Sequence, residues 1–236
     1  MSLSLVIPFY NEEENVHEVV FEIIQEFDQR KISYSLICVN NGSSDNTPNI
    51  LIDLSEKYPQ IKTVTVEKNK GYGFGVLKGL QLANNYYVGY SVGDGQISAA
   101  DVAKVYEVAK NDNLDFCQGK RNTRDSLLRK LSTRTHNLIF HLFFPCSVYD
   151  IGSNPKIMRK NVFDEIKPMS EGWFIDGEII LKNYLRNSKM KEISVSAIIR
   201  DKGESKHIIL HTIFEMLLNI IKWRFKAWFS STRYFV

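Results

Sequence analysis

The chain has 236 residues, 44% of them hydrophobic, and carries a formal net charge of +3 at pH 7. This length suits one α/β domain with or without an appendage, and the apolar fraction excludes a disordered chain. The charge is too small for a general nucleic-acid-binding surface, so we expect no nucleic-acid partner. No run of about 20 uninterrupted apolar residues is present, and we therefore expect no membrane-spanning helix.

The cysteines indicate a reducing compartment. Cys38, Cys117 and Cys146 are far apart and odd in number, which favours reduced thiols over a disulfide or a metal site. The N-terminus enters an apolar segment without a preceding basic region, so no signal peptide is expected. We therefore expect a cytoplasmic protein.

Strand and helix signals alternate through the first two-fifths of the chain. Short apolar segments predict strands at 3–8, 34–40, 61–67 and 86–91, and helical spacing predicts helices at 11–30, 44–58 and 73–85. In the first helix the apolar residues share one face: Val16, Val19, Val20, Ile23, Ile24 and Phe27. Asp45 or Thr47 is the expected N-cap of the second helix, with Pro48 in its first turn. This alternation predicts a mostly parallel, doubly wound sheet.

The second half is less regular. We expect strands at 114–122, 154–160 and 191–200, and helices at 124–144 and 172–187. The basic segment 120–134 is either a solvated helix face or a surface for an anionic acceptor or lipid headgroups.

Four loops follow the first four predicted strands, at 8–12, 40–45, 69–75 and 92–96. Each is rich in Gly, Asn, Asp or Pro, and ligands of such sheets bind beyond the carboxyl ends of the strands. The glycine-rich loop at 69–80 is not a dinucleotide fingerprint, because Val76 stands where the last Gly would be required. It is either a plain turn or a helix start that offers backbone N–H groups to an anion.

Asn40 and Asn41 follow the second strand. They could shape an Asx-rich turn, or their mixed donors and acceptors could bind the edge of a uracil base. A guanine edge would be better served by a carboxylate, so a uridine nucleotide is favoured.

Seven ordered motifs resemble family 2 glycosyltransferases: VIPFYNEEENV, CVNNGSSDNT, NKGYGFGVLKGL, VGDGQIS, DIGSNPKIMRK, GWFIDGEIILK and RDKGESKH. The set covers residues 3–207 and looks most like dolichyl- or polyprenyl-phosphate sugar transferases and bacterial surface-polysaccharide relatives. The resemblance implies an α/β fold of GT-A type, with a Rossmann-like, mostly parallel sheet flanked by helices. It also implies a nucleotide-sugar donor and a Mg²⁺ or Mn²⁺ ion.

The resemblance also implies roles for residues on the donor side. Asp94 matches the second Asp of the family's D-x-D signature and would hold the metal, while Val92 replaces the first Asp. One carboxylate can suffice for Mg²⁺ when phosphates and water complete its shell. The donor-side residues are Pro8, Tyr10, Glu12, Asn40, Asn41, Gly71, Lys78, Asp94 and Gln96.

On the acceptor side, Asp176 is the first candidate for a general base and Glu178 the second, if the acceptor is a hydroxyl. A lipid phosphate is already an anion and needs no base, so Asp176 would then orient other groups. Asp176 could instead be a helix N-cap. Arg200 and Lys206 complete the catalytic candidates, and the expected acceptor-side residues are Lys120, Arg121, Arg124, Arg134, Glu204 and Ser205.

The stretch 208–229 predicts an amphipathic helix. His211, Glu215, Asn219, Lys222 and Lys226 form one polar stripe on it. Such a helix suits a membrane interface, although it could also pack on the protein's own core or on a partner. We therefore expect a glycosyltransferase domain at 1–207 and a membrane-interface or partner-binding tail at 208–236.

Together these features predict an inverting glycosyltransferase, peripheral on the cytoplasmic face of a membrane, with UDP favoured over GDP. The acceptor would be a polyprenyl or dolichyl phosphate or a lipid-linked glycan, and a membrane-protein partner is a further expectation. Because Asn40, Asn41 and Val92 stand where Asp is usual, the alternative is a catalytically weakened donor-binding or partner subunit. A nicotinamide-dependent oxidoreductase is a third hypothesis, and the missing dinucleotide fingerprint at 69–80 counts against it.

Overall fold

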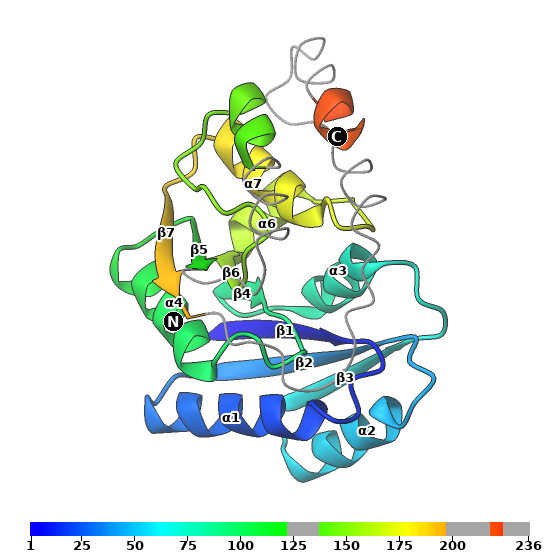
Figure 1. Cartoon of the computed structure of the whole chain (residues 1–236). Coiled ribbons are helices and arrows are strands. Elements are labelled where there is room, and N and C mark those ends of the chain that lie inside the picture. The colour runs from blue at the N-terminus through cyan, green and yellow to red at the C-terminus, as the bar shows by residue number, and fades with distance from the viewer. Residues whose placement is uncertain (122–136, 197–217, 224–236) are drawn as a thin grey trace.

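The computed structural model describes residues 1–121, 137–196 and 218–223 (Figure 1). Its strands are β1 Leu3–Phe9, β2 Tyr34–Asn41, β3 Ile61–Val66, β4 Tyr87–Tyr90, β5 Phe116–Arg121, β6 Lys156–Arg159 and β7 Met190–Val195. Its helices are α1 Val16–Gln29, α2 Thr47–Lys57, α3 Tyr72–Leu82, α4 Ala99–Asn111, α6 Lys160–Ile166 and α7 Ile175–Leu185. Residues 137–143 and 218–223 are also helical.

The strands form one sheet in the order β3-β2-β1-β4-β6-β5-β7. Every pairing is parallel except those of β6, which runs antiparallel to both β4 and β5. The mostly parallel sheet predicted from the alternation of elements is therefore confirmed. Because β6 is reversed, its first residue, Lys156, lies beside Tyr90 at the carboxyl end of β4.

Helices cover both faces of the sheet (Figure 1). One core packs α1, α2 and α4 against side chains such as Leu5 and Ile7 of β1. The other packs α3, α6 and α7 against the opposite face, which includes Val6. Successive β1 side chains thus serve opposite cores, as the two-residue period of a strand requires.

The predicted helices are present, but the first two begin later than predicted: α1 at Val16 instead of residue 11, and α2 at Thr47 instead of residue 44. All six residues of the predicted apolar face of α1 are buried. Helix α2 begins at Thr47 with Pro48 in its first turn, but its N-cap position is Asn46, which makes no side-chain cap. Asp45 accepts a hydrogen bond from the backbone N–H of Thr47 at 3.0 Å instead. Helix α6 was not predicted, because it is a short segment that directly continues β6.

The C-terminal stretch is described only at 218–223. There Ile220 and Trp223 are buried in the core beside α7, whereas Leu218 and Ile221 are 52% and 46% exposed. Packing on the protein's own core, one of the alternatives for this helix, is therefore seen for these two buried residues. The domain boundary at 207 and the rest of 208–236 lie outside the described residues. In the parts of the chain that are described, no helix is long and apolar enough to cross a membrane.

Candidate active site

The loops after β1 and β2 are joined into one unit by hydrogen bonds. The backbone N–H groups of Asn11 and Glu12 donate to Ser43 Oγ and Thr47 Oγ1, each at 3.0 Å. Asn11 adopts a left-handed conformation with φ of 52°, which turns the chain back toward the second loop. This arrangement holds the predicted nucleoside residues Pro8, Tyr10 and Glu12 next to the carboxyl end of β2.

Asn40 and Asn41 are buried, with 4% and 3% exposure. Asn40 Oδ1 accepts the N–H of Ser43, three residues further on, at 3.0 Å, so Asn40 stabilises the turn after β2, in line with the turn interpretation. Asn41 Nδ2 donates to the Gly71 carbonyl at 3.1 Å and thereby links this loop to the start of α3. Asn41 Oδ1 is buried without a hydrogen-bond partner in the described structure.

The glycine-rich loop enters α3 through Gly71, whose φ of +119° a side chain would strain. The N–H of Phe74, in the first turn of α3, donates to the Glu171 carbonyl at 2.8 Å. One of the backbone N–H groups that could bind a diphosphate at the start of α3 therefore already donates a hydrogen bond within the protein. Lys78 is exposed, with Nζ 5.2 Å from the centre of the Phe74 ring, so its ammonium group remains accessible to solvent.

Asp94 lies on the turn that follows β4. Its Oδ1 accepts the N–H of Gln96 at 3.1 Å, and Gly95 has a φ of +74°. A Cβ atom on Gly93 would lie 2.5 Å from the Phe9 ring, so this turn packs directly on the end of β1. The predicted metal residue therefore lies next to the predicted nucleoside loop.

The donor set at this turn fits a cation that is held together with phosphate groups. The described residues contain no cluster of three or more His, Cys, Asp or Glu side chains that could hold a metal. Mg²⁺ is commonly bound by one or two carboxylates plus substrate phosphates and water. Asp94 would hold such an ion together with the donor's diphosphate.

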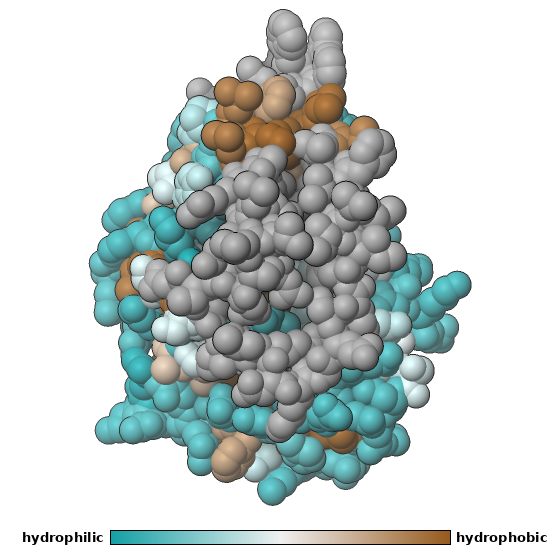
Figure 2. Space-filling model, in the orientation of Figure 1, coloured by the Kyte–Doolittle hydropathy of each residue, from teal (hydrophilic) through white to brown (hydrophobic). Residues whose placement is uncertain are grey.

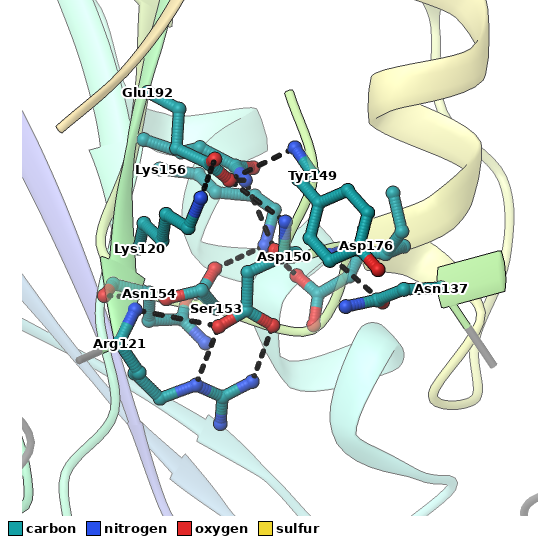
Figure 3. Close-up of polar contacts among 12 residues, drawn as sticks. Lys120, Arg121, Asn137, Tyr149, Asp150, Ser153, Asn154, Lys156, Asp176 and Glu192 are labelled. Atoms are coloured by element: carbon teal, nitrogen blue, oxygen red, sulfur yellow. Dashed lines mark hydrogen bonds and ion pairs between the residues drawn. The ribbon is translucent and has the colours of Figure 1, made fainter. Parts of the chain in front are cut away.

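Asp176 lies in a buried polar cluster with Lys156 and Tyr90. Its Oδ1 is 2.9 Å from Lys156 Nζ and accepts a hydrogen bond from the Tyr90 hydroxyl at 2.7 Å. Lys156 is fully buried, and its ammonium also donates to the Ser153 carbonyl (Figure 3). The interpretation of Asp176 as a helix N-cap is wrong. Phe174 occupies the N-cap position, and Asp176 is the second residue of α7.

Burial and a neighbouring charge shift the pKa of Lys156 in opposite directions. Burial lowers the pKa of Lys156, and the neighbouring Asp176 carboxylate opposes that change. The Tyr90 hydroxyl has its pKa raised well above the usual value, by burial first and then by the charge of Asp176. Tyr90 therefore stays protonated, and its hydroxyl donates a hydrogen bond to Asp176 Oδ1.

Tyr72 connects this cluster to the Asp94 turn. Burial raises the pKa of Tyr72, and the charges of Asp176 and Asp94 raise it further, so both carboxylates act on one hydroxyl. Its ring stacks on Trp173 with centroids 4.8 Å apart, and its hydroxyl accepts a 3.4 Å hydrogen bond from Asn154. The predicted metal residue and the first catalytic candidate lie in one region, because Tyr90 ends β4 and contacts Asp176, while Asp94 lies on the turn that follows β4.

Glu178 has a different environment, although it is only two residues beyond Asp176. It is fully buried, forms an ion pair with Lys182 at 2.9 Å, and accepts backbone N–H groups from Met169 and Ser170. The structure therefore does not bring Glu178 together with Asp176.

The acceptor-side residues that are described lie at the end of β5. Arg121 forms a two-pronged contact with Asp150, with its Nε and Nη2 donating at 3.1 and 3.0 Å. Lys120 is 3.7 Å from Glu192, whose other oxygen accepts the N–H groups of Tyr149 and Asp150 (Figure 3). The remaining predicted residues lie outside the described ranges: Arg124, Arg134, Arg200, Glu204, Ser205 and Lys206.

Asp150 and Lys156 lie in the motif DIGSNPKIMRK, but the sequence alone predicted no role for them. A signal was present, since a Lys in a strand segment must find a partner when it is buried. Tyr72, Tyr90 and Trp173 were also missed, because aromatic residues in such segments usually serve the core.

Comparison with known proteins places these observations in a family. The sequence model of glycosyl transferase family 2 matches residues 4–170. The chain is 29% identical over 234 residues to the dolichol-phosphate mannosyltransferase of Pyrococcus furiosus, covering 94% of this chain and 64% of that protein. It is 26% identical over 225 residues to the dodecaprenyl-phosphate galacturonate synthase of Rhizobium johnstonii, covering 94% of this chain and 66% of that protein. The chain thus spans about two thirds of the length of these relatives.

Solved structures share the fold. Glucosyl-3-phosphoglycerate synthase from Mycobacterium tuberculosis, in complex with Mn²⁺, UDP and glucosyl-3-phosphoglycerate, superposes with a TM-score of 0.73 at 15% identity. The match covers 93% of this chain and 79% of that one. The same enzyme with Mn²⁺, UDP and phosphoglyceric acid gives a TM-score of 0.74 at 14% identity. The expected GT-A architecture is confirmed.

Proposed function

Because this chain belongs to glycosyl transferase family 2, we propose that it transfers a sugar from a nucleotide-diphosphate donor to a polyprenyl phosphate. The relatives named above act on dolichol phosphate and dodecaprenyl phosphate, which supports this acceptor class. The proposed donor residues lie at or after the carboxyl ends of β1, β2, β3 and β4. The proposed acceptor side lies beyond β5 and around Asp176.

The observation that carries the choice of acceptor is the set of contacts of Asp176. The Asp176 carboxylate is already engaged by two donors of the protein, the Lys156 ammonium and the Tyr90 hydroxyl, which fix its position. A hydroxyl acceptor would need a base to remove its proton, whereas a phosphate acceptor is already an anion. Both contacts of Asp176 within the described residues end on Oδ1. Its Oδ2 therefore suits the orienting of a substrate group.

The proposed reaction is a single in-line displacement with inversion at the anomeric carbon. A phosphate oxygen of the acceptor forms the new bond to that carbon, and the bond to the β-phosphate oxygen of the donor breaks. Negative charge then builds on the leaving diphosphate. A divalent cation held by Asp94 would offset that charge, and the solved neighbours that contain Mn²⁺ with UDP support this assignment.

The main test is sugar transfer from a panel of radiolabelled UDP and GDP sugars to polyprenyl phosphate in detergent with Mn²⁺. We expect labelled lipid product with at least one donor. If no donor gives product or is hydrolysed, the chain is not a competent transferase, and the donor-binding subunit becomes the better account.

A uridine nucleotide is the proposed donor carrier. A carboxylate at the position of Asn40 or Asn41 would favour guanine, whereas the amide groups suit the edge of uracil. The buried Asn41 Oδ1 also has no hydrogen-bond partner in the described structure. We expect isothermal calorimetry to give tighter binding of UDP than of GDP, by about tenfold if one hydrogen bond discriminates them. Equal or tighter binding of GDP would refute this preference.

We also propose that the protein is peripheral on the cytoplasmic face of a membrane, bound through the helical segments 137–143 and 218–223. Figure 2 shows hydrophobic surface gathered at the end of the molecule where Figure 1 places these segments. Leu138 and Leu142, one helical turn apart, are 67% and 78% exposed, and Leu218 and Ile221 are also exposed. The basic and aromatic sequence KWRFKAWF at 222–229 suits anionic lipid headgroups.

The double substitution Leu138→Ser, Leu142→Ser is expected to weaken binding to anionic lipid vesicles by about tenfold or more, because two apolar side chains are lost from the contact. Ile52→Ser on α2 is the matched control, since Ile52 is 48% exposed on a helix that packs on the opposite face of the sheet. Co-sedimentation measures both. Unchanged binding of the double variant would rule out this surface.

A further inference from the structure

The segment 167–174, between α6 and α7, packs closely against the glycine-rich start of α3. Besides the bond from Phe74 to the Glu171 carbonyl, Gly71 and Gly73 lie so near that added Cβ atoms would be 2.6 Å and 2.4 Å from the carbonyl oxygens of Glu171 and Ser170. Such contacts leave no space for a side chain at either glycine. The position of this segment therefore sets the position of the glycine-rich loop.

One buried ion pair on α7 holds the segment in place. The Glu178 carboxylate accepts the N–H of Met169 at 3.0 Å and that of Ser170 at 2.7 Å. Its partner Lys182 lies 2.9 Å away and also donates to the Lys167 carbonyl at 2.8 Å. Both ends of the pair thus bind backbone groups of the same segment.

The pair is shielded from water. Glu178 is fully buried and Lys182 is 6% exposed, and the Lys182 ammonium lies 5.1 Å from the centre of the Trp223 ring. Removing two charges from water is costly, and a pair of well-packed apolar residues is often as stable. Overall stability is therefore a poor explanation for this pair, whereas its hydrogen bonds to the backbone of Lys167, Met169 and Ser170 explain a fixed segment.

We propose that Glu178 and Lys182 are positioning residues, which hold segment 167–174 against the start of α3 and thereby preserve the donor side of the site. Residues two apart on a helix do not face each other, so Glu178 cannot share the role of Asp176. The effect reaches the site through the Glu171 carbonyl and through Trp173, which stacks on Tyr72. The inference rests on the proposed function only in taking the glycine-rich loop as the donor side.

The test is hydrogen exchange of the folded full chain without ligand, together with calorimetric binding of UDP and Mn²⁺. In Glu178→Gln, the amide hydrogens of Met169 and Ser170 are expected to exchange about tenfold faster or more, because two charge-assisted hydrogen bonds are weakened. Affinity for UDP is expected to fall. Because Glu178→Gln leaves Lys182 buried without its partner, Glu178→Gln, Lys182→Met is measured too, and it is expected to show the same local change in a stable protein.

Glu165→Gln is the matched control, because it removes a carboxylate from a partly exposed ion pair with Arg186 between α6 and α7. We expect it to leave the exchange of Met169 and Ser170 unchanged. The proposal is overturned if the folded double variant shows wild-type exchange at these two amides, or if exchange rises and UDP affinity stays the same. Exchange is measured without nucleotide. A chain that fails to bind UDP at all therefore contradicts the proposed uridine donor, and the exchange result still tests whether Glu178 and Lys182 hold segment 167–174.

Discussion

Replacement of Asp94 by Asn is expected to lower the rate of sugar transfer by about 10²–10³-fold, because it removes the proposed carboxylate ligand of a cation that stabilises charge on the leaving diphosphate. Nucleotide binding gives a second measurement. Mn²⁺ is expected to tighten UDP binding in the wild-type chain and to have little effect in Asp94→Asn.

Two variants make this prediction specific. Asp53→Asn changes an exposed carboxylate on α2 and should leave transfer and Mn²⁺ dependence unchanged. Val92→Asp restores the missing first carboxylate of the D-x-D signature, and we expect it to lower the Mn²⁺ concentration needed for half-maximal UDP binding. Transfer that persists unaltered in Asp94→Asn would show that the metal role of Asp94 is wrong.

Replacement of Lys156 by Met is expected to destabilise the protein by about 3–5 kcal/mol, since it leaves the Asp176 carboxylate buried without its partner. Lys156 is fully buried and lies 2.9 Å from Asp176. The free energy of unfolding, measured by urea denaturation, reports this loss. Transfer is also expected to fall, because Asp176 then lacks the contact that fixes its carboxylate.

The double variant Lys156→Met, Asp176→Leu separates stability from activity. Removing both charges eliminates the unpaired carboxylate, so we expect much of the lost stability to return. Transfer should remain low, because the orienting carboxylate is gone. A double variant with near wild-type transfer would show that this cluster is structural only.

Much of the fold could be predicted from local patterns. The alternating signals of the first half identified the parallel strands, because each βαβ unit is built from neighbouring residues. The reversal of β6 could not be read in this way, since NPKIMRK gives no sign of direction and strand order depends on distant partners. That reversal is what carries Lys156 to the edge of the sheet where Tyr90 ends.

The site, like the fold, could be predicted only in part from the sequence. Asp94 and Asp176 were predicted as site residues from their motifs, and both carboxylates raise the pKa of Tyr72. The environments of Asp176 and Glu178 could not be distinguished, because both are acids in one helical turn. Only the three-dimensional packing shows that one contacts Lys156 across the sheet edge and the other contacts Lys182 and the backbone of segment 167–174.

The central claim is that the site transfers a sugar to a phosphate anion without a general base. The most direct measurement compares polyprenyl phosphate with the matching polyprenol as acceptors, at equal concentration, with one active nucleotide sugar and Mn²⁺. We expect labelled product from polyprenyl phosphate and none above background from polyprenol. Comparable transfer to the free alcohol would contradict the account, because an alcohol acceptor requires a general base to remove its proton.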